Sequence, residues 1–205
     1  YAYSGAGVTV VTDPILRTAE YQFTTNSKVT QVANPAGGLT MLYGYDARGN
    51  LAHLGGPNGN DYEYDASGNL TRVETAHPDP GNPARLETRF TYDPCNQVVS
   101  TTDALGRVTT NTYDPTTCHL IAIADPLGHI TSFVNNGRGQ PITIVDARLK
   151  QTHNTYDTRG NLVATEDHGG NTTAMGYDLL NRKVSETAPG ALVPTTFEYD
   201  LFDRQ

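Results

Sequence analysis

The sequence predicts an all-β protein made of tandem antiparallel β-hairpin repeats of about 21 residues. Three observations support this prediction. Tyr-Asp pairs recur at a nearly constant spacing, each pair opens a short turn, and six or seven residues of strand character separate the turns. The composition agrees, because 20 Gly, 12 Pro and 12 Tyr with no Trp are typical of many short strands joined by tight turns. The low hydrophobic content also fits disorder, but regular spacing argues against it.

The Tyr-Asp pairs define the repeat. They stand at Tyr45-Asp46, Tyr64-Asp65, Tyr92-Asp93, Tyr113-Asp114, Tyr156-Asp157, Tyr177-Asp178 and Tyr199-Asp200. The interval of 43 residues between Tyr113 and Tyr156 holds two repeats, with Asn135-Asn136 in place of the hidden pair. Phe23 and Tyr3 extend the same phase backwards. The chain is therefore predicted to be a single array, 1–205, of about ten repeats.

Each repeat contains two turns. The first follows the tyrosine and the second lies about ten residues later. Expected first turns include Asp46–Gly49, Asp65–Gly68, Asn136–Gly139 and Asp157–Gly160, and expected second turns include Asn34–Gly37, Asp103–Gly106 and Asp125–Gly128. Asp or Asn at the first position, Pro at the second and Gly at the fourth favour a type I turn. Gly, or Asn at 96 and 181, supplies the left-handed residue that closes a three-residue hairpin loop.

The strands between these turns include 107–113 and 119–124, and alternation along them predicts an aromatic face. The signature tyrosine and the residue two positions before it share one side of a strand. Examples are Tyr43 with Tyr45, Phe90 with Tyr92, and Met175 with Tyr177, whereas the residue between is mostly polar or Gly. We expect Tyr92, Tyr113, Tyr156 and Tyr177 to lie on one face. Packing between repeats is the favoured role of these rings, and stacking on sugars is the functional alternative.

The array is too wide for a flat sheet. About twenty strands at ~4.8 Å each would span roughly 95 Å, whereas open twisted sheets rarely exceed ~10 strands without curling. The sequence therefore predicts a long curled sheet, a spiral or shell wall, as a fragment of a larger closed object. One loop insertion, 76–85, carries three prolines and a glycine. Residues 77–83 within it are expected to protrude.

Charge and hydropathy exclude two kinds of partner. The formal net charge is −8 and no Lys/Arg cluster offsets it, so the surface repels phosphate backbones. No apolar run approaches the ~20 residues that a membrane helix needs. We expect neither a nucleic-acid partner nor a membrane span.

A family resemblance rests on these motifs. Residues 89–131 read RFTYDPCNQVVSTTDALGRVTTNTYDPTTCHLIAIADPLGHIT, in which Tyr-Asp, Gly-[Asn/Arg]-[Leu/Val] and Asp-x-x-Gly recur in phase. Nearly the whole chain resembles the YD-repeats of the RHS family. That family includes bacterial polymorphic toxins, the B/C components of insecticidal toxin complexes, wall-associated proteins and, more distantly, the teneurin shell.

The resemblance implies a β-strip wound into a hollow shell. In toxin members the shell encloses a C-terminal toxic domain and is often cut from it by an aspartyl-protease-like core region. The sequence to Gln205 is all repeat, so that protease activity is assigned to no residue here. The expected function is a structural shell segment of an exported bacterial toxin or surface protein, whose partner is the rest of its own chain. The alternative is a secreted binding or adhesion module that recognises cell-surface carbohydrate.

Other chemistry finds little support in the sequence. The six histidines show no metal-ligand spacing and are expected to be solvated turn residues: His53, His77, His119, His129, His153 and His168. The Asp-rich segment 57–69 fits neither an EF-hand nor a nonapeptide Ca²⁺ repeat. A carboxylate pair for glycoside hydrolysis stays open, although the repeat explains nearly every Asp. We therefore expect no enzyme activity, no cofactor and no metal.

The two cysteines, Cys95 and Cys118, fall in the first turns of neighbouring repeats. Like positions in successive hairpins are ~10 Å apart, whereas a disulfide needs Cα atoms within about 7 Å. Turns extend beyond the sheet, however, and the second of these turns carries one extra residue. The spacing therefore makes a disulfide a candidate without deciding it, and an exported protein could form one.

Overall fold

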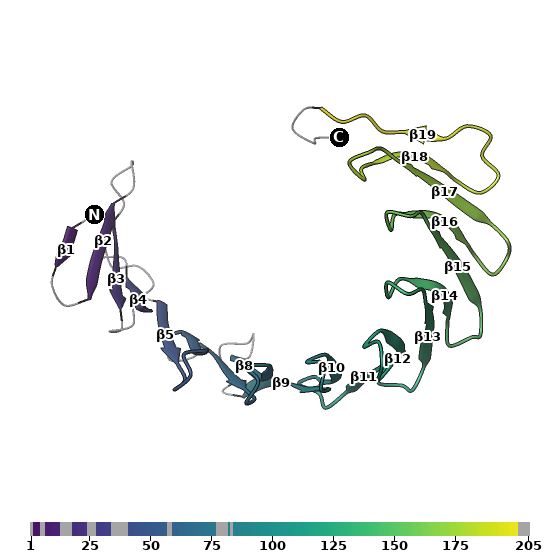
Figure 1. The fold of residues 1–205 in the computed structure, drawn as a ribbon. Helices are drawn as coiled ribbons and strands as arrows, with labels where there is room; N and C mark the ends of the chain where they lie inside the picture. Colours follow the sequence, from purple (N-terminus) through teal and green to yellow (C-terminus); the bar gives the residue numbers. More distant parts are fainter. Residues whose placement is uncertain are drawn as a thin grey trace. The chain divides into compact units, whose positions relative to one another are not determined.

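The computed structural model describes residues 2–4, 7–12, 18–23, 28–33, 41–56, 59–76, 82 and 84–200. The chain divides into two compact units, Tyr1–Val108 and Thr109–Gln205. The described residues form 19 strands and no helix, which confirms the all-β prediction (Figure 1). No helix in this part of the chain is long and apolar enough to cross a membrane.

Strands follow one another at the pitch that the repeat predicts. The first unit holds β1 (Ala2–Ser4), β2 (Val8–Thr12), β3 (Thr18–Phe23), β4 (Val29–Ala33), β5 (Met41–Tyr45), β6 (Leu51–Gly55), β7 (Asn60–Tyr64), β8 (Leu70–Ala76), β9 (Arg85–Tyr92) and β10 (Val98–Thr102). The second unit holds nearly all of β11 (Val108–Tyr113), then β12 (Leu120–Ala124), β13 (Ile130–Asn135), β14 (Pro141–Val145), β15 (Gln151–Tyr156), β16 (Leu162–Glu166), β17 (Thr172–Tyr177), β18 (Lys183–Thr187) and β19 (Thr195–Thr196).

Every strand within a unit pairs antiparallel with the next one along the chain. This holds from β1 to β10 and again from β11 to β19. Consecutive pairing is what short hairpin turns dictate, because a tight turn can only join antiparallel neighbours. The tandem hairpin architecture is thereby confirmed.

A β-bulge recurs at the signature residue. Tyr156 pairs with Leu162 and Thr155 with Ala164, so the second strand contributes one extra residue there. The same shift occurs at Phe23, Tyr45, Tyr64, Tyr92, Tyr113, Asn135 and Tyr177. Such bulges increase the local right-handed twist of the strand pair.

The expected turns form as predicted. The amide of Gly49 donates to the carbonyl of Asp46, and equivalent bonds close Asp103–Gly106, Asp125–Gly128 and Asp157–Gly160. The closing residue is left-handed, with φ of 86° at Gly49 and 61° at Asn181. A further turn of this kind, Asp146–Leu149, was not predicted, because Leu149 occupies the left-handed position with φ 62°.

The two faces of the sheet differ in exposure. In β15 the face of Thr152, Asn154 and Tyr156 is half-buried, whereas Gln151 and His153 on the other face are exposed. Alternation and register place Tyr113, Tyr156 and Tyr177 on one face of the second unit. They likewise place Tyr45, Tyr64 and Tyr92 on one face of the first. The one-face prediction is confirmed for Tyr113, Tyr156 and Tyr177, which lie in one unit, whereas Tyr92 lies in the other unit with Tyr45 and Tyr64. No described hydrophobic side chain is fully buried.

Some predictions lie outside the described residues. These are the turn Asn34–Gly37 and the insertion 77–83, of which only Asn82 is described. The first and last residues of the loop insertion, Ala76 and Arg85, pair with each other at the ends of β8 and β9.

Candidate functional site: signature turns and aromatic face

The signature aspartate organises each first turn. Oδ1 of Asp157 accepts hydrogen bonds from the amides of Arg159 and Asn161, both at 2.9 Å, and Oδ2 accepts one from Asn161 Nδ2 at 2.9 Å. These donors favour the carboxylate form, so the pKa of Asp157 is lowered, chiefly by the Asn161 side chain. Asp65 is held in the same way by Ser67 and Asn69. The carboxylates thus stabilise their own turns, and no reaction is needed to explain them.

Consecutive first turns are joined to one another. Arg159 Nη1 donates to the carbonyl of Asp178 at 3.1 Å, and Asn161 Nδ2 donates to Asn181 Oδ1 at 2.9 Å. Gln140 Nε2 donates to the carbonyl of Gly160 at 2.7 Å. The first unit repeats the pattern in two bonds, from Arg48 to Asp65 and from Asn69 to Asn96. One edge of the array is therefore a ladder of hydrogen-bonded turns.

The signature tyrosines lock neighbouring hairpins in register. The hydroxyl of Tyr92 donates to the carbonyl of Leu70 at 2.6 Å. Leu70 is the residue that pairs with Tyr64, the signature tyrosine of the preceding repeat. The same contact joins Tyr45 to Val29, Tyr156 to Pro141 and Tyr199 to Lys183. The hydroxyls of these tyrosines thus make contacts between repeats.

Asn135 stands at the signature position of the hidden repeat. It pairs with Pro141 across the usual bulge, and Asn136 begins the following turn. Asn135 Nδ2 donates to the carbonyl of Leu120 at 2.7 Å, and this bond replaces the one that a tyrosine hydroxyl makes in other repeats. Leu120 pairs with Tyr113, so the register contact is kept although the ring is missing.

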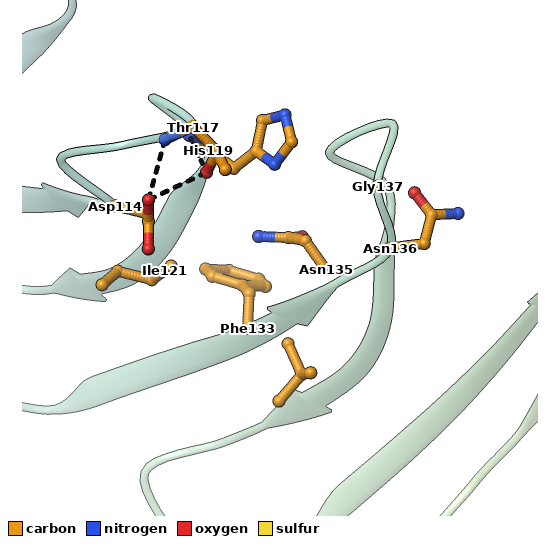
Figure 2. A pocket seen from close by; sticks show the side chains of 9 residues that line it. Asp114, Thr117, His119, Ile121, Phe133, Asn135, Asn136 and Gly137 are labelled. Atoms are coloured by element: carbon orange, nitrogen blue, oxygen red, sulfur yellow. Dashed lines mark hydrogen bonds between the residues drawn. The ribbon is translucent and has the colours of Figure 1, made fainter.

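A pocket of about 400 Å³ lies beside Asn135 (Figure 2). Phe133 and Ile121 supply apolar surface, and His119 also lines the pocket. The rest of the lining comes from Asp114, Thr117, Val134, Asn136 and Gly137. Oδ1 of Asp114 accepts bonds from the amides of Thr116 and Thr117. The pocket combines an aromatic wall with hydrogen-bonding groups, which suits a ring-shaped polar ligand.

A second polar cluster covers the other face of β6–β9. His53 Nδ1 lies 2.6 Å from Asp61 Oδ1, and its Nε2 lies 3.1 Å from the carbonyl of Gly56. Two acceptors favour the imidazolium, so the pKa of His53 is raised, chiefly by the bond to Asp61. Arg85 bridges Asp61 and Glu74 at 2.8 and 2.5 Å. These are cross-strand ion pairs that join neighbouring strands.

The structure corrects the interpretation of the histidines. His53 lies in β6 and His153 in β15, so the prediction that all six are turn residues is wrong for these two. His53 is ion-paired because its strand position faces Asp61 across the β6–β7 pair. His129 follows its turn as expected, with Nδ1 2.9 Å from Asp125 Oδ2. His77 is outside the described residues. Within the described part of the chain, no group of three His, Cys, Asp or Glu side chains could hold a metal ion.

Both cysteines of the chain, Cys95 and Cys118, are disulfide-bonded. Cys95 is the third residue of its turn, and its amide donates to Asp93 Oδ1. Cys118 occupies the left-handed position of a turn that is one residue longer, with φ 57°. The two positions are therefore not equivalent within their turns.

Sequence reasoning missed the bonds between repeats. The signals were present in the repeated letters, since arginine stands third in the turns at Arg48 and Arg159. Asn likewise recurs at 69 and 161, directly after the turn glycine. Their partners lie 17 to 27 residues away, however, and only the strand register brings them within reach.

The family comparison matches this geometry. The RHS Repeat family model matches residues 45–79 and 156–193. These two stretches are similar to RHS repeats. The two matched stretches include the signature turns at Asp46, Asp65, Asp157 and Asp178, which the ladder joins. A comparison with curated proteins finds no match.

Comparison with solved structures supports the fold through one match with a TM-score above 0.5, and two further matches are weaker. The crystal structure of TcdB2-TccC3-TEV is 15% identical with a TM-score of 0.54, over 92% of this chain and 13% of that one. That of TcdB2-TccC3-Cdc42 is 13% identical with a TM-score of 0.48, over 87% and 12%. A Tc holotoxin pore from Photorhabdus luminescens is 11% identical with a TM-score of 0.37, over 87% and 13%. The chain thus spans about an eighth of the length of these structures.

Proposed function

We propose that this chain is a stretch of wall in a hollow RHS-repeat shell that encloses or presents a C-terminal toxin or effector domain. The role is mechanical, since the wall keeps an enclosed polypeptide away from its surroundings. The principal partner is the rest of the same chain, and the protein is exported. We assign no enzyme activity, cofactor or metal to these repeats.

The observation that carries the proposal is the contact of each repeat with the next. Turn-to-turn bonds such as Arg159 to Asp178 and hydroxyl bonds such as Tyr92 to Leu70 join successive hairpins without a buried core in the described residues. Such an array can be extended by adding repeats, because each repeat contacts only the repeats before and after it. Within each unit the strands pair only with their neighbours along the chain, which is the pattern that further repeats can continue. An extendable strip is the form that a shell wall requires.

Export is supported by the disulfide chemistry. Both cysteines are bonded, and disulfides persist in oxidising environments outside the cytosol. A disulfide contributes to the stability of a one-layer sheet because the described part of the sheet has no fully buried hydrophobic side chains.

The test uses the complete natural protein, including any sequence beyond Gln205. Limited proteolysis of that protein should spare a C-terminal domain as long as the repeats are folded, and should degrade it after they unfold. Electron microscopy should show a closed shell with density inside. A C-terminal domain digested at the same rate before and after unfolding would refute enclosure.

Carbohydrate recognition is the alternative function, and the same preparation tests it. The tyrosines that would stack on sugars already serve contacts between repeats, as the hydroxyl bonds of Tyr45, Tyr92, Tyr156 and Tyr199 show. A glycan array probed with the intact protein should therefore give no saturable signal. Strong glycan binding together with an unprotected C-terminus would favour the adhesion module.

A further inference from the structure

The pocket beside Asn135 lies at the signature position, which a tyrosine occupies in most of the other repeats. In those repeats the tyrosine contacts the repeat before it, as Tyr92 does through the carbonyl of Leu70. Burial raises the pKa of Tyr92, and the negative charge of Asp65 raises it further. Asp65 is the signature aspartate of that preceding repeat, so it lies near the Tyr92 hydroxyl. The corresponding residue for position 135 is Asp114, and Asp114 lines the pocket. The location of the pocket therefore matches the missing ring.

A second observation gives the pocket its ring-binding wall. The residue that follows each first turn can lie over the next signature ring. Lys28 Nζ is 4.9 Å from the ring centre of Tyr45, and the Arg182 guanidinium is 4.8 Å from that of Tyr199. His119 follows the turn before Asn135 and so occupies this position, but no signature ring stands there; its imidazole lies against Gly139 and lines the pocket (Figure 2). Phe133, two residues before Asn135, supplies an aromatic surface beside it.

Hydrogen-bonding groups at the rim suit a hydroxyl. In the turns of Asp65 and Asp157, Oδ2 accepts a bond from the Asn that follows the turn. The turn of Asp114 has an extra residue, and His119 takes the place of that Asn. Within the described residues, the hydrogen bonds to Asp114 all use Oδ1. Oδ2 is thus an acceptor that a ligand hydroxyl can use.

We infer that this pocket binds a single phenol ring, placed between His119 and Phe133 with its hydroxyl directed to the polar rim near Asp114. The ligand ring takes the place of the tyrosine ring, whereas the carbonyl of Leu120 keeps its bond from Asn135. A volume of about 400 Å³ lies within the ~300–1,000 Å³ range of small-molecule sites. The phenol is either a free small molecule or the tyrosine side chain of another polypeptide segment. This inference does not depend on the shell role.

The test titrates the 205-residue chain with p-cresol and follows the aromatic NMR signals of Phe133 and His119. We expect saturable shifts with a dissociation constant on the order of 1 mM, as befits so small a ligand. Toluene, which lacks the hydroxyl, should bind more weakly. Methyl glucoside should not bind, and a site that takes the glycoside but not the cresol would overturn the inference.

Asn135→Tyr is the decisive variant because it returns the ring to the pocket. It should abolish cresol binding and raise the thermal midpoint, whereas Asn135→Ala should keep binding. If Asn135→Tyr does not fold, His119→Ala serves instead, and should weaken binding at least tenfold by removing one wall. Cresol binding that is unchanged in the folded variant, or absent from the wild type, refutes the site. Acetyl-tyrosine-amide and a tyrosine within a short extended peptide distinguish a free phenol from a polypeptide side chain.

Discussion

At the scale of single residues, the tyrosine and the aspartate of the signature act over different ranges. The carboxylate of Asp157 bonds within its own turn, to groups two and four residues later. The hydroxyl of Tyr92 instead reaches a carbonyl 22 residues earlier in the chain. One residue of the pair therefore shapes a hairpin, and the other fixes that hairpin against its neighbour.

This division predicts the effect of removing one hydroxyl. Tyr92→Phe should reduce the free energy of unfolding by about 1 kcal/mol, because it leaves the Leu70 carbonyl without its donor. Tyr177→Phe is the matched control, since Tyr177 holds the same signature position and the described residues offer its hydroxyl no hydrogen bond. Urea denaturation measures both. Equal losses in the two variants would mean that the hydroxyl bond contributes nothing specific.

At the scale of the elements, the turns are defined by their left-handed residue and by their aspartate. Gly occupies the left-handed position at 106, whereas Asn does so at 96 and 181 and Leu at 149. The Leu149 turn shows that the remaining bonds can hold a residue that rarely adopts this conformation. Its aspartate, Asp146, still accepts the amides of Arg148 and Lys150.

Substitutions at Gly106 test how much the left-handed backbone conformation of the turn contributes to stability. A Cβ built there meets no heavy atom within 4 Å, and φ is 76°, so a substitution changes conformation without crowding. Gly106→Asn should be nearly neutral, whereas Gly106→Val should destabilise the protein by about 1–2 kcal/mol. The measurement is the urea midpoint of each variant. Equal effects of Asn and Val would show that the left-handed conformation is not what limits this turn.

The turn carboxylates predict sensitivity to acid. Hydrogen bonds lower the pKa of Asp157 below its ordinary value of 3.8. A lowered folded-state pKa means that the stabilisation is complete above the unfolded value and is lost as pH falls through the folded one. Asp157→Asn should therefore be less stable than the wild type at neutral pH, and the difference should shrink as the pH falls below 3.8. Asn136 shows that Asn can fill this position, since its Oδ1 accepts the amides of Arg138 and Gln140.

The converse variant, Asn136→Asp, controls for changes elsewhere. It should introduce a new acid-dependent contribution where the wild type has none. Both variants are measured by chemical denaturation across the acid range. A constant stability difference between wild type and Asp157→Asn at every pH would contradict the linkage.

At the scale of the whole molecule, stability comes from contacts between neighbouring repeats. No described hydrophobic side chain is fully buried, and several at turn tips are largely exposed, among them Leu127 at 81%. In such a protein the stability of each repeat depends on its neighbours. A covalent bond between repeats therefore has a large effect on the free energy of unfolding. The two compact units each show the same hairpin pattern.

The disulfide prediction belongs to this scale. The unreduced, denatured protein should show no titratable thiol, and reduction should release two from Cys95 and Cys118. A bond between them closes a loop of about 24 residues, for which the chain-entropy model gives about 3 kcal/mol. Reduction should therefore lower the thermal midpoint, and the double variant Cys95→Ala/Cys118→Ala should match the reduced protein. Two thiols before reduction would contradict the bond.

The sequence by itself determined the hairpins, the turns at Asp46, Asp103 and Asp157, and the face that the tyrosines share within each unit. Those features depend on preferences within four or five residues, such as a left-handed Gly or an aspartate that bonds its own turn, so they can be read in order along the chain. Only the tertiary structure decided which groups meet across repeats. The bond from Tyr92 to Leu70 and the pocket that Asn135 leaves open both depend on the register of separate hairpins. Register is a property of paired strands, so no single stretch of sequence contains it.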